Sequence, residues 1–194
     1  DEARRFANDR LGLYGTDTDL GWEYFWQYHD MLDKAGSTVN LATQVGHGTV
    51  RAAVIGFEDR GPTPWELDRM KGLVADGLDD GALGFSTGLF YAPGSFARTE
   101  EVVALASEAA NRGKLYSTHM RDESDYSISL LGPVEESIAI GRLSGVRVQI
   151  SHLKCVGPAS WGRSQELLDR IDRARAEGLD VAADQYPYTA SSTS

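Results

Sequence analysis

Two stretches of the chain, KLYSTHM at residues 114–120 and VRVQISHLK at residues 146–154, share one design. Each is a short run with the composition of a buried strand, and each carries a histidine near its end, His119 in the first and His152 in the second. The residues between them, 121–145, read as a polar loop followed by a helix that stops at Gly145. Two successive strand–helix units are therefore predicted to finish their strands with an imidazole.

The same alternation extends in both directions. An amphipathic helix is expected over 22–36, and helices are also expected over 63–81, 99–113, 133–145 and 164–178. The predicted strands are 37–46, 82–87, 114–119, 146–152 and 179–188. Short apolar strands that alternate with helices predict an α/β fold with a parallel sheet, whose strands are buried on both faces.

The predicted helix boundaries rest on local signals. Thr63, Pro64 and Glu66 form a capping-box pattern with proline at the first helical position. Thr99 is expected to cap the helix that follows it, and Gly36 to end the first helix.

Two architectures fit this order of elements, an open doubly wound sheet and part of a TIM-like (β/α)8 barrel. A complete barrel needs about 250 residues, and this chain has 194. The sequence stops just after the last predicted strand, which favours a single partial barrel over residues 1–194.

Composition narrows the classes of function. The chain has 19 basic and 29 acidic side chains, a formal charge of −10, which argues against a nucleic-acid partner. It has no apolar run of about 18 residues, and its first ten residues lack the apolar core of a signal peptide, so we expect no membrane partner. Cys155 is the single cysteine, which excludes an internal disulfide framework and fits a reducing, cytoplasmic location.

Polar residues gather where the predicted strands end, which is where parallel α/β folds place their functional groups. In chain order they are His47, Arg51, Ser86, Thr87, His119, Arg121, Asp122, Glu123, His152, Lys154, Cys155, Asp184, Tyr186 and Tyr188.

Two neutral imidazoles from adjacent strands can face one ion, and Zn²⁺ is the ion that such nitrogens usually bind. The alternative is a pair of histidines that form hydrogen bonds inside a polar barrel mouth. Two ligands do not complete a catalytic zinc site, so a third must come from elsewhere. Cys155 is expected to be a buried or incidental thiol, and His29 a packed or surface side chain of its aromatic helix. The segment GHGTVR (46–51) lacks the third glycine of the dinucleotide-binding fingerprint and the Gly-Lys-Ser/Thr of a P-loop, so nucleotide binding is not expected.

Five blocks in order carry a family resemblance: VGHGTVR, GALGFSTGLFYAPGSFARTEEVVALA, YSTHMRDE, VQISHLK and DQYPYTASST. Together they resemble the D-aminoacylase (N-acyl-D-amino-acid deacylase) branch of the amidohydrolase superfamily. The resemblance implies a metal-dependent barrel, with one or two divalent ions, that hydrolyses the amide of N-acyl-D-amino acids. It implies that His119 and His152 bind zinc, and that Lys154, Tyr186 and Ser192 hold the substrate. Tyr186 is also expected to donate a hydrogen bond to the developing oxyanion.

The chain also departs from that family's pattern. It has no His-x-His pair, and Cys155 does not match the family's metal-binding cysteine. The family's catalytic aspartate is expected beyond Ser194, and Asp184 is not assigned that role. The resemblance therefore implies about strands three to seven of the barrel, an isolated chain with negligible turnover, and either self-association or the rest of the barrel as its partner.

Two rival hypotheses remain. A dihydroorotase-like or hydantoinase-like enzyme shares the two histidines but normally carries a carbamylated lysine, and no lysine ends the predicted strands 37–46 and 82–87. A non-catalytic fragment that associates with itself through unpaired sheet edges is the other.

Overall fold

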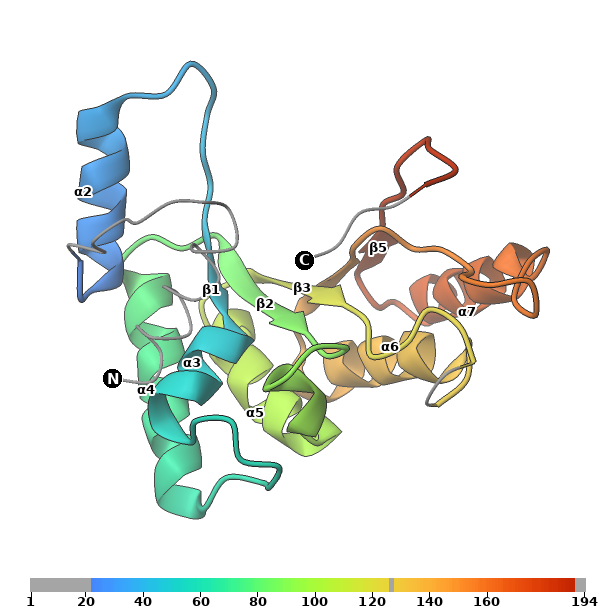
Figure 1. Ribbon diagram of the computed structural model, residues 1–194, viewed down its shortest axis with the longest axis horizontal. Coiled ribbons are helices and arrows are strands. Elements are labelled where there is room, and N and C mark those ends of the chain that lie inside the picture. The colour runs from blue at the N-terminus through green and yellow to red at the C-terminus, as the bar shows by residue number, and fades with distance from the viewer. Residues whose placement is uncertain (1–21, 126–127, 191–194) are drawn as a thin grey trace.

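The computed structural model describes residues 22–125 and 128–190, and its centre is one parallel sheet (Figure 1). The sheet has five strands in the order β1-β2-β3-β4-β5, and each strand pairs in parallel with the next. This arrangement confirms the predicted α/β fold with parallel strands. The strands are β1 (Gln44–Gly46), β2 (Gly84–Gly88), β3 (Leu115–His119), β4 (Arg147–Ile150) and β5 (Val181–Ala183).

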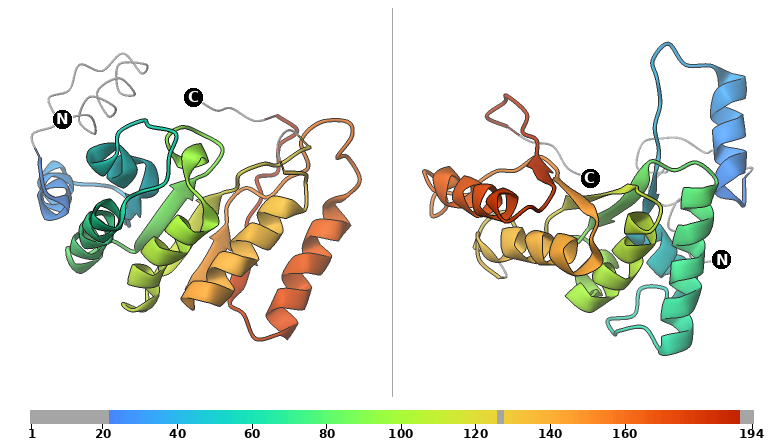
Figure 2. Two further views of the ribbon diagram at one scale, coloured as in Figure 1. Left: turned by 90° about the horizontal axis from the view of Figure 1, so that it is seen from below. Right: turned by 180° about the vertical axis from the view of Figure 1, so that it is seen from behind.

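The helices that connect the strands cover one face of the sheet, and one further helix precedes the first strand. They are α2 (Phe25–Ala35), α3 (His47–Val54), α4 (Pro64–Asp79), α5 (Thr99–Ala110), α6 (Gly132–Ser144) and α7 (Ser164–Ala176), with a 3₁₀ turn η1 (Gly94–Phe96). Figure 2 shows α4, α5, α6 and α7 standing in a row, each against the next, on the same side of the strands. No helix of the described residues is both long and apolar enough to cross a membrane.

The register of the sheet aligns one continuous apolar row. Its members, Val45, Phe85, Tyr116, Val148 and Val181, pair in sequence across all five strands, and each is buried. This row packs into the core cluster that the helices share. Strand side chains alternate between the two faces, so the row fixes which residues point the other way.

The opposite face of the sheet is polar and less buried. Ser86, Ser117 and Gln149 form the next row, and none of them is buried. The expectation that the strands are buried on both faces is therefore wrong for the residues that the structure describes. His119 lies two residues after Ser117 and shares its face, so it points away from the helices.

Two glycines allow helices to approach the sheet closely. A Cβ on Gly77 of α4 would lie 2.6 Å from Cγ2 of Val45, and one on Gly141 of α6 would lie 2.6 Å from Cγ2 of Val148. The apolar row therefore touches helix backbone at both positions.

Several predicted boundaries hold and others do not. Thr63 Oγ1 accepts from the Glu66 amide at 3.3 Å, and a Glu66 carboxylate oxygen accepts from the Thr63 amide at 2.7 Å, so the capping box is confirmed. Gly36 ends α2 with a φ of 74°. Thr99, by contrast, is the first residue of α5 rather than its cap, and its hydroxyl donates to Glu136 at 2.8 Å.

Helix α3 was not predicted. The predicted strand 37–46 is too long, because β1 covers only Gln44–Gly46, and the helix begins directly after it at His47. A helix of eight residues that follows a strand directly, with glycine and a β-branched valine near its start, has little local signal.

Candidate metal centre

The two strand-end histidines are positioned by different parts of the structure. His119 is the last residue of β3. His152 lies two residues beyond β4. Its backbone has a φ of 44°, which is uncommon for a residue other than glycine. Its amide donates to Oδ1 of Asp184 at 2.7 Å, while the Asp184 amide donates to the carbonyl of Ile150 at 3.1 Å. Asp184 therefore extends the β4–β5 ladder and holds the unusual backbone of His152 in place.

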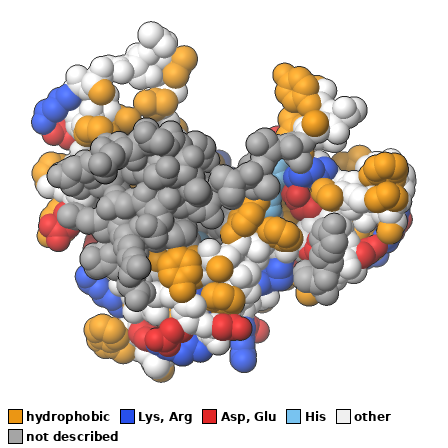
Figure 3. Space-filling view, viewed as in Figure 1, with side chains coloured by type: hydrophobic (Ala, Val, Ile, Leu, Met, Phe, Trp, Pro, Cys, Tyr) orange, Lys and Arg blue, Asp and Glu red, His pale blue; other side chains and the backbone are white. Residues whose placement is uncertain are grey.

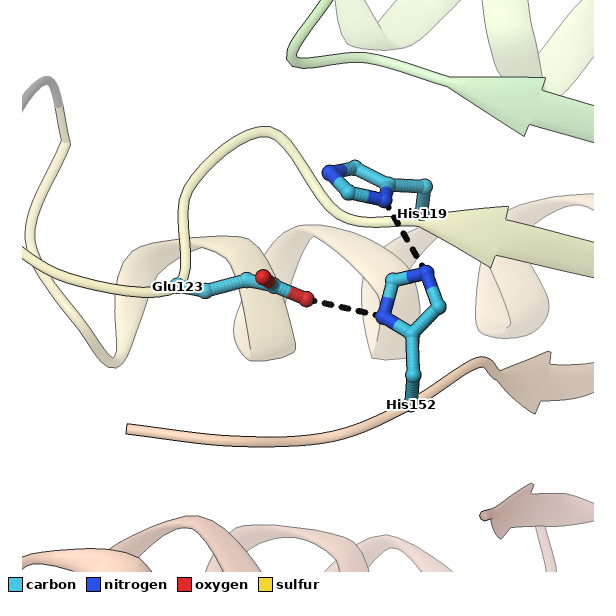
Figure 4. A group of neighbouring side chains, drawn as sticks. All are labelled: His119, Glu123 and His152. Carbon is cyan, nitrogen blue, oxygen red and sulfur yellow. Dashed lines mark hydrogen bonds and ion pairs between the residues drawn. The ribbon is translucent and has the colours of Figure 1, made fainter. Parts of the chain in front are cut away.

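The imidazoles meet as the sequence predicted. Nδ1 of His119 lies 3.0 Å from Nε2 of His152, and the ring centroids are 4.6 Å apart (Figure 4). Glu123, from the loop after β3, lies on the other side of His152, with Oε1 3.0 Å from its Nδ1. One potential ligand atom from each of the three residues lies within 4.8 Å of the other two.

Glu123 was named among the strand-end polar residues but was not placed with the histidines. Its only sequence signal is its position four residues after His119 in the same loop. Loop conformation decides whether such a side chain turns back toward the strand end, and no periodicity encodes it.

The nitrogen donors fit a zinc ion. Zn–N bonds of about 2.0–2.1 Å in a tetrahedral arrangement place two ligand nitrogens about 3.3 Å apart. His119 Nδ1 and His152 Nε2 share a hydrogen bond at 3.0 Å, as the alternative hypothesis expected, and this separation is also close to the value for a shared zinc ion. A small opening of the pair would admit the ion.

Lys154 joins the cluster as a cation. Its Nζ donates to Oε1 of Glu123 at 2.6 Å and to the carbonyl of His152 at 2.9 Å, and it lies 2.9 Å from Nδ1 of His152. It also lies 5.6 Å from the ring centre of Tyr186. The structure therefore brings Lys154 to His152 and Tyr186 to Lys154, while Ser192 lies outside the described residues.

The surroundings of His119 favour its neutral form. Burial is the largest cause, and the charges of His152 and Lys154 act the same way, so the pKa of His119 lies below its ordinary value although Glu123 opposes the shift. A neutral imidazole is the form that binds a metal. The rings of Phe90 and Tyr91 lie 6.1 and 4.9 Å from that of His119 and form one wall of the site. Figure 3 shows histidine surface beside basic and acidic side chains in the hollow of the molecule.

Other predicted candidates lie elsewhere. Cys155 is partly buried against the apolar core and is not in the metal-binding group, and burial raises the pKa of its thiol. His29 packs between Asp80, whose carbonyl is 3.2 Å from its Nδ1, and the hydroxyl of Thr43. Both residues match the structural roles that the sequence suggested.

His47 belongs to a separate buried network. Its Nε2 lies 2.8 Å from Oε1 of Glu101, and Arg51 Nη1 donates to Oε2 of the same carboxylate at 2.6 Å. Burial opposes ionisation of Glu101, but the hydrogen bonds and charges of His47 and Arg51 outweigh it and lower its pKa. Although His47 follows a strand, it joins α3 to α5 and does not reach the histidine pair.

Comparison with known proteins gives close relatives, although no family model matches the chain. It is 43% identical over 166 residues to an N-acyl-D-glutamate deacylase of Alcaligenes xylosoxydans xylosoxydans, covering 86% of this chain and 33% of that protein. It is 42% identical over 172 residues to a D-aminoacylase of the same organism, covering 89% of this chain and 35% of that protein. The chain thus spans about a third of the length of these relatives.

Solved structures agree. An N-acyl-D-glutamate deacylase from Bordetella bronchiseptica, complexed with zinc and a phosphonate inhibitor that mimics the tetrahedral intermediate, superposes with a TM-score of 0.83 at 40% identity. The match covers 89% of this chain and 36% of that one. A D-aminoacylase structure gives a TM-score of 0.80 at 42% identity, covering 85% and 34%.

The hydantoinase alternative has weaker support. A D-hydantoinase matches with a TM-score of 0.54 at 14% identity, which shows a common fold and nothing finer. The identity to the deacylases and D-aminoacylases is much higher, at 40–43%. The sequence blocks and the parallel sheet point to the same family. The chain is therefore a homologue of the D-aminoacylases of the amidohydrolase superfamily and matches about a third of their length.

Proposed function

We propose that this chain is part of a zinc-dependent amidohydrolase that cleaves the amide bond of N-acyl-D-amino acids to give a carboxylate and a free D-amino acid. The observation that carries the proposal is the 3.0 Å approach of His119 Nδ1 to His152 Nε2 at adjacent strand ends. Similarity to deacylases, one of them bound to zinc, supports the substrate class and the metal. On the same basis, we assign the chain to about strands three to seven of a (β/α)8 barrel.

Each residue has a distinct part in this proposal. His119 and His152 hold the ion, which when bound polarises the acyl carbonyl and acidifies a water molecule. Lys154 offers a positive charge to the carboxylate of the substrate, which suits an anionic amino acid. The hydroxyl of Tyr186 donates to the oxygen on which negative charge develops, and Ser192 is proposed as a further substrate contact.

We further propose that the 194-residue chain has negligible turnover by itself. Among the described residues, only His119, Glu123 and His152 form a group able to hold a metal. Asp184 is an unsuitable proton acceptor, because its carboxylate accepts hydrogen bonds from the His152 amide at 2.7 Å and from Gln149 Nε2 at 2.6 Å. Robust hydrolysis of N-acetyl-D-amino acids by the purified chain would contradict this part of the proposal.

The metal is tested by measuring zinc per chain by elemental analysis in the parent and in His119→Ala and His152→Asn. Asparagine is chosen because it accepts a positive φ more readily than alanine. Zinc bound by the parent and lost in both variants would support the assignment. Zinc bound equally by all three proteins would refute it, whereas no zinc in any of them would show that the site needs ligands from outside this chain.

A further inference from the structure

We propose that Glu123 is a positioning residue that turns the Nε2 lone pair of His152 toward His119 and so makes the histidine pair able to bind a metal. This inference rests on the proposed function and adds a residue to it. Glu123 acts through the ring of His152 and does not itself hold the ion.

Two groups compete for Nδ1 of His152. Oε1 of Glu123, which can only accept when ionised, lies 3.0 Å away, and Nζ of Lys154, which can only donate when charged, lies 2.9 Å away. If Nδ1 carries the hydrogen and donates to Glu123, Nε2 presents a lone pair to the site, which accepts the 3.0 Å hydrogen bond from Nδ1 of His119 when no ion is bound. If Lys154 donates to Nδ1, the hydrogen is on Nε2, where it points at His119 and blocks the ion.

The contacts favour the first arrangement. The ammonium of Lys154 already has two oxygen acceptors, Glu123 Oε1 at 2.6 Å and the carbonyl of His152 at 2.9 Å. The carboxylate draws Lys154 to itself and leaves Nδ1 free to donate to the same oxygen. A carboxylate that accepts the second ring hydrogen of a ligating histidine is a common device for fixing its tautomer.

The loop is built to hold this carboxylate in place. Oδ1 of Asp122 accepts hydrogen bonds from the amide of Glu123 at 2.8 Å and from the amide and hydroxyl of Ser124 at 2.9 and 2.7 Å. The carbonyl of Glu123 accepts from the amide of Val156 at 2.7 Å, which ties the loop after β3 to the loop after β4. The Glu123 side chain is only 10% exposed.

Charge explains why Glu123 is not the better direct ligand. An ion shared by Glu123 and Nδ1 of His152 would lie beside the ammonium of Lys154, which touches both atoms. An ion between the two imidazoles lies on the other side of the His152 ring. The His152 ring then separates the metal from Lys154, and the carboxylate of Glu123 beside Lys154 offsets part of the repulsion between the two cations.

The test has two readouts, zinc affinity by titration and the tautomer of His152 in the metal-free chain by ¹⁵N NMR of its ring. The variants are Glu123→Gln, Lys154→Met and, as a matched loss of one negative charge, the exposed Glu100→Gln. In the metal-free parent we expect the hydrogen on Nδ1. In Glu123→Gln we expect the hydrogen to shift toward Nε2 and the zinc affinity to fall about 10–100-fold. Lys154→Met and Glu100→Gln are expected to keep the parent tautomer without weakening zinc.

Hydrogen on Nε2 in the parent, or an unchanged tautomer in Glu123→Gln, would overturn the proposal. Complete loss of zinc with an unchanged tautomer would do so as well, because it would make Glu123 a direct ligand. Failure of the parent to bind zinc would refute zinc binding by the histidine pair of this chain and not the role of Glu123, since the metal-free tautomers still decide that role. If Glu123→Gln does not fold, the parent and Lys154→Met tautomers decide it.

Discussion

Arg51 of α3 donates a 2.6 Å hydrogen bond to Glu101 of α5 where the two side chains are 0% and 2% exposed. His47 shares the carboxylate, so one acidic group serves two nitrogen-bearing partners inside the protein. Glu101→Ala would leave the guanidinium buried without its counter-charge. We expect a loss of about 3–5 kcal/mol of unfolding free energy, measured by urea denaturation, with Glu100→Ala as the exposed control.

The same carboxylate predicts a pH dependence. The folded state lowers the pKa of Glu101 below its ordinary 4.5, so its stabilisation is complete above that value and is lost as the pH falls through the lower, folded-state pKa. Unfolding free energy measured between neutral and acidic pH should fall more steeply in the parent than in Glu101→Gln. Identical slopes would show that this group does not contribute to acid unfolding.

Helix α6 should not tolerate a methyl group where it meets the sheet. Alanine ordinarily gains up to about 1 kcal/mol over glycine inside a helix. At Gly141 the new Cβ would lie 2.6 Å from Val148, and we expect a net destabilisation of about 1–3 kcal/mol. Gly72→Ala in α4 is the control, because its Cβ would meet no atom within 4 Å, and it should stabilise. The Tm of each variant is measured by thermal unfolding. An equal change in Tm for the two variants would contradict the close packing at Gly141.

Zinc should stabilise the folded chain if the histidine pair binds it. A ligand that binds only the folded state adds about 2.7 kcal/mol at one hundred times its Kd. The gain should appear as a higher Tm with added zinc and should vanish in His119→Ala. An equal rise in that variant would place the ion elsewhere.

The outer strands of the sheet predict self-association. Within the described residues, β1 pairs only with β2, and β5 pairs only with β4. The outer edges of β1 and β5 therefore have no partner strand there. Such edges promote pairing with another chain. Size-exclusion chromatography with light scattering should therefore give a mass above the 21.1 kDa of one chain. A monomer at high concentration would contradict this expectation.

The parallel sheet and the meeting of His119 with His152 were predictable because both depend on element order. Strands joined by helices run parallel, and parallel strands bring their carboxyl ends to one edge. The place of Glu123 was not predictable, because the turn built on Asp122 decides it. Helix α3 was missed for a related reason, since His47 and Arg51 are stabilised by Glu101, a partner 54 and 50 residues away.

The apolar row that runs from Val45 to Val181 also aligns the five strands, and each strand ends within three residues of its member of the row. Side chains alternate every residue along a strand, so one residue inserted into β4 between Val148 and His152 would displace either the valine from the core or the histidine from its place beside His119. The register of this row therefore affects both the packing of the core and the positions of the proposed metal ligands. Insertions and deletions should therefore be tolerated better in the loops between these strands than within the strands.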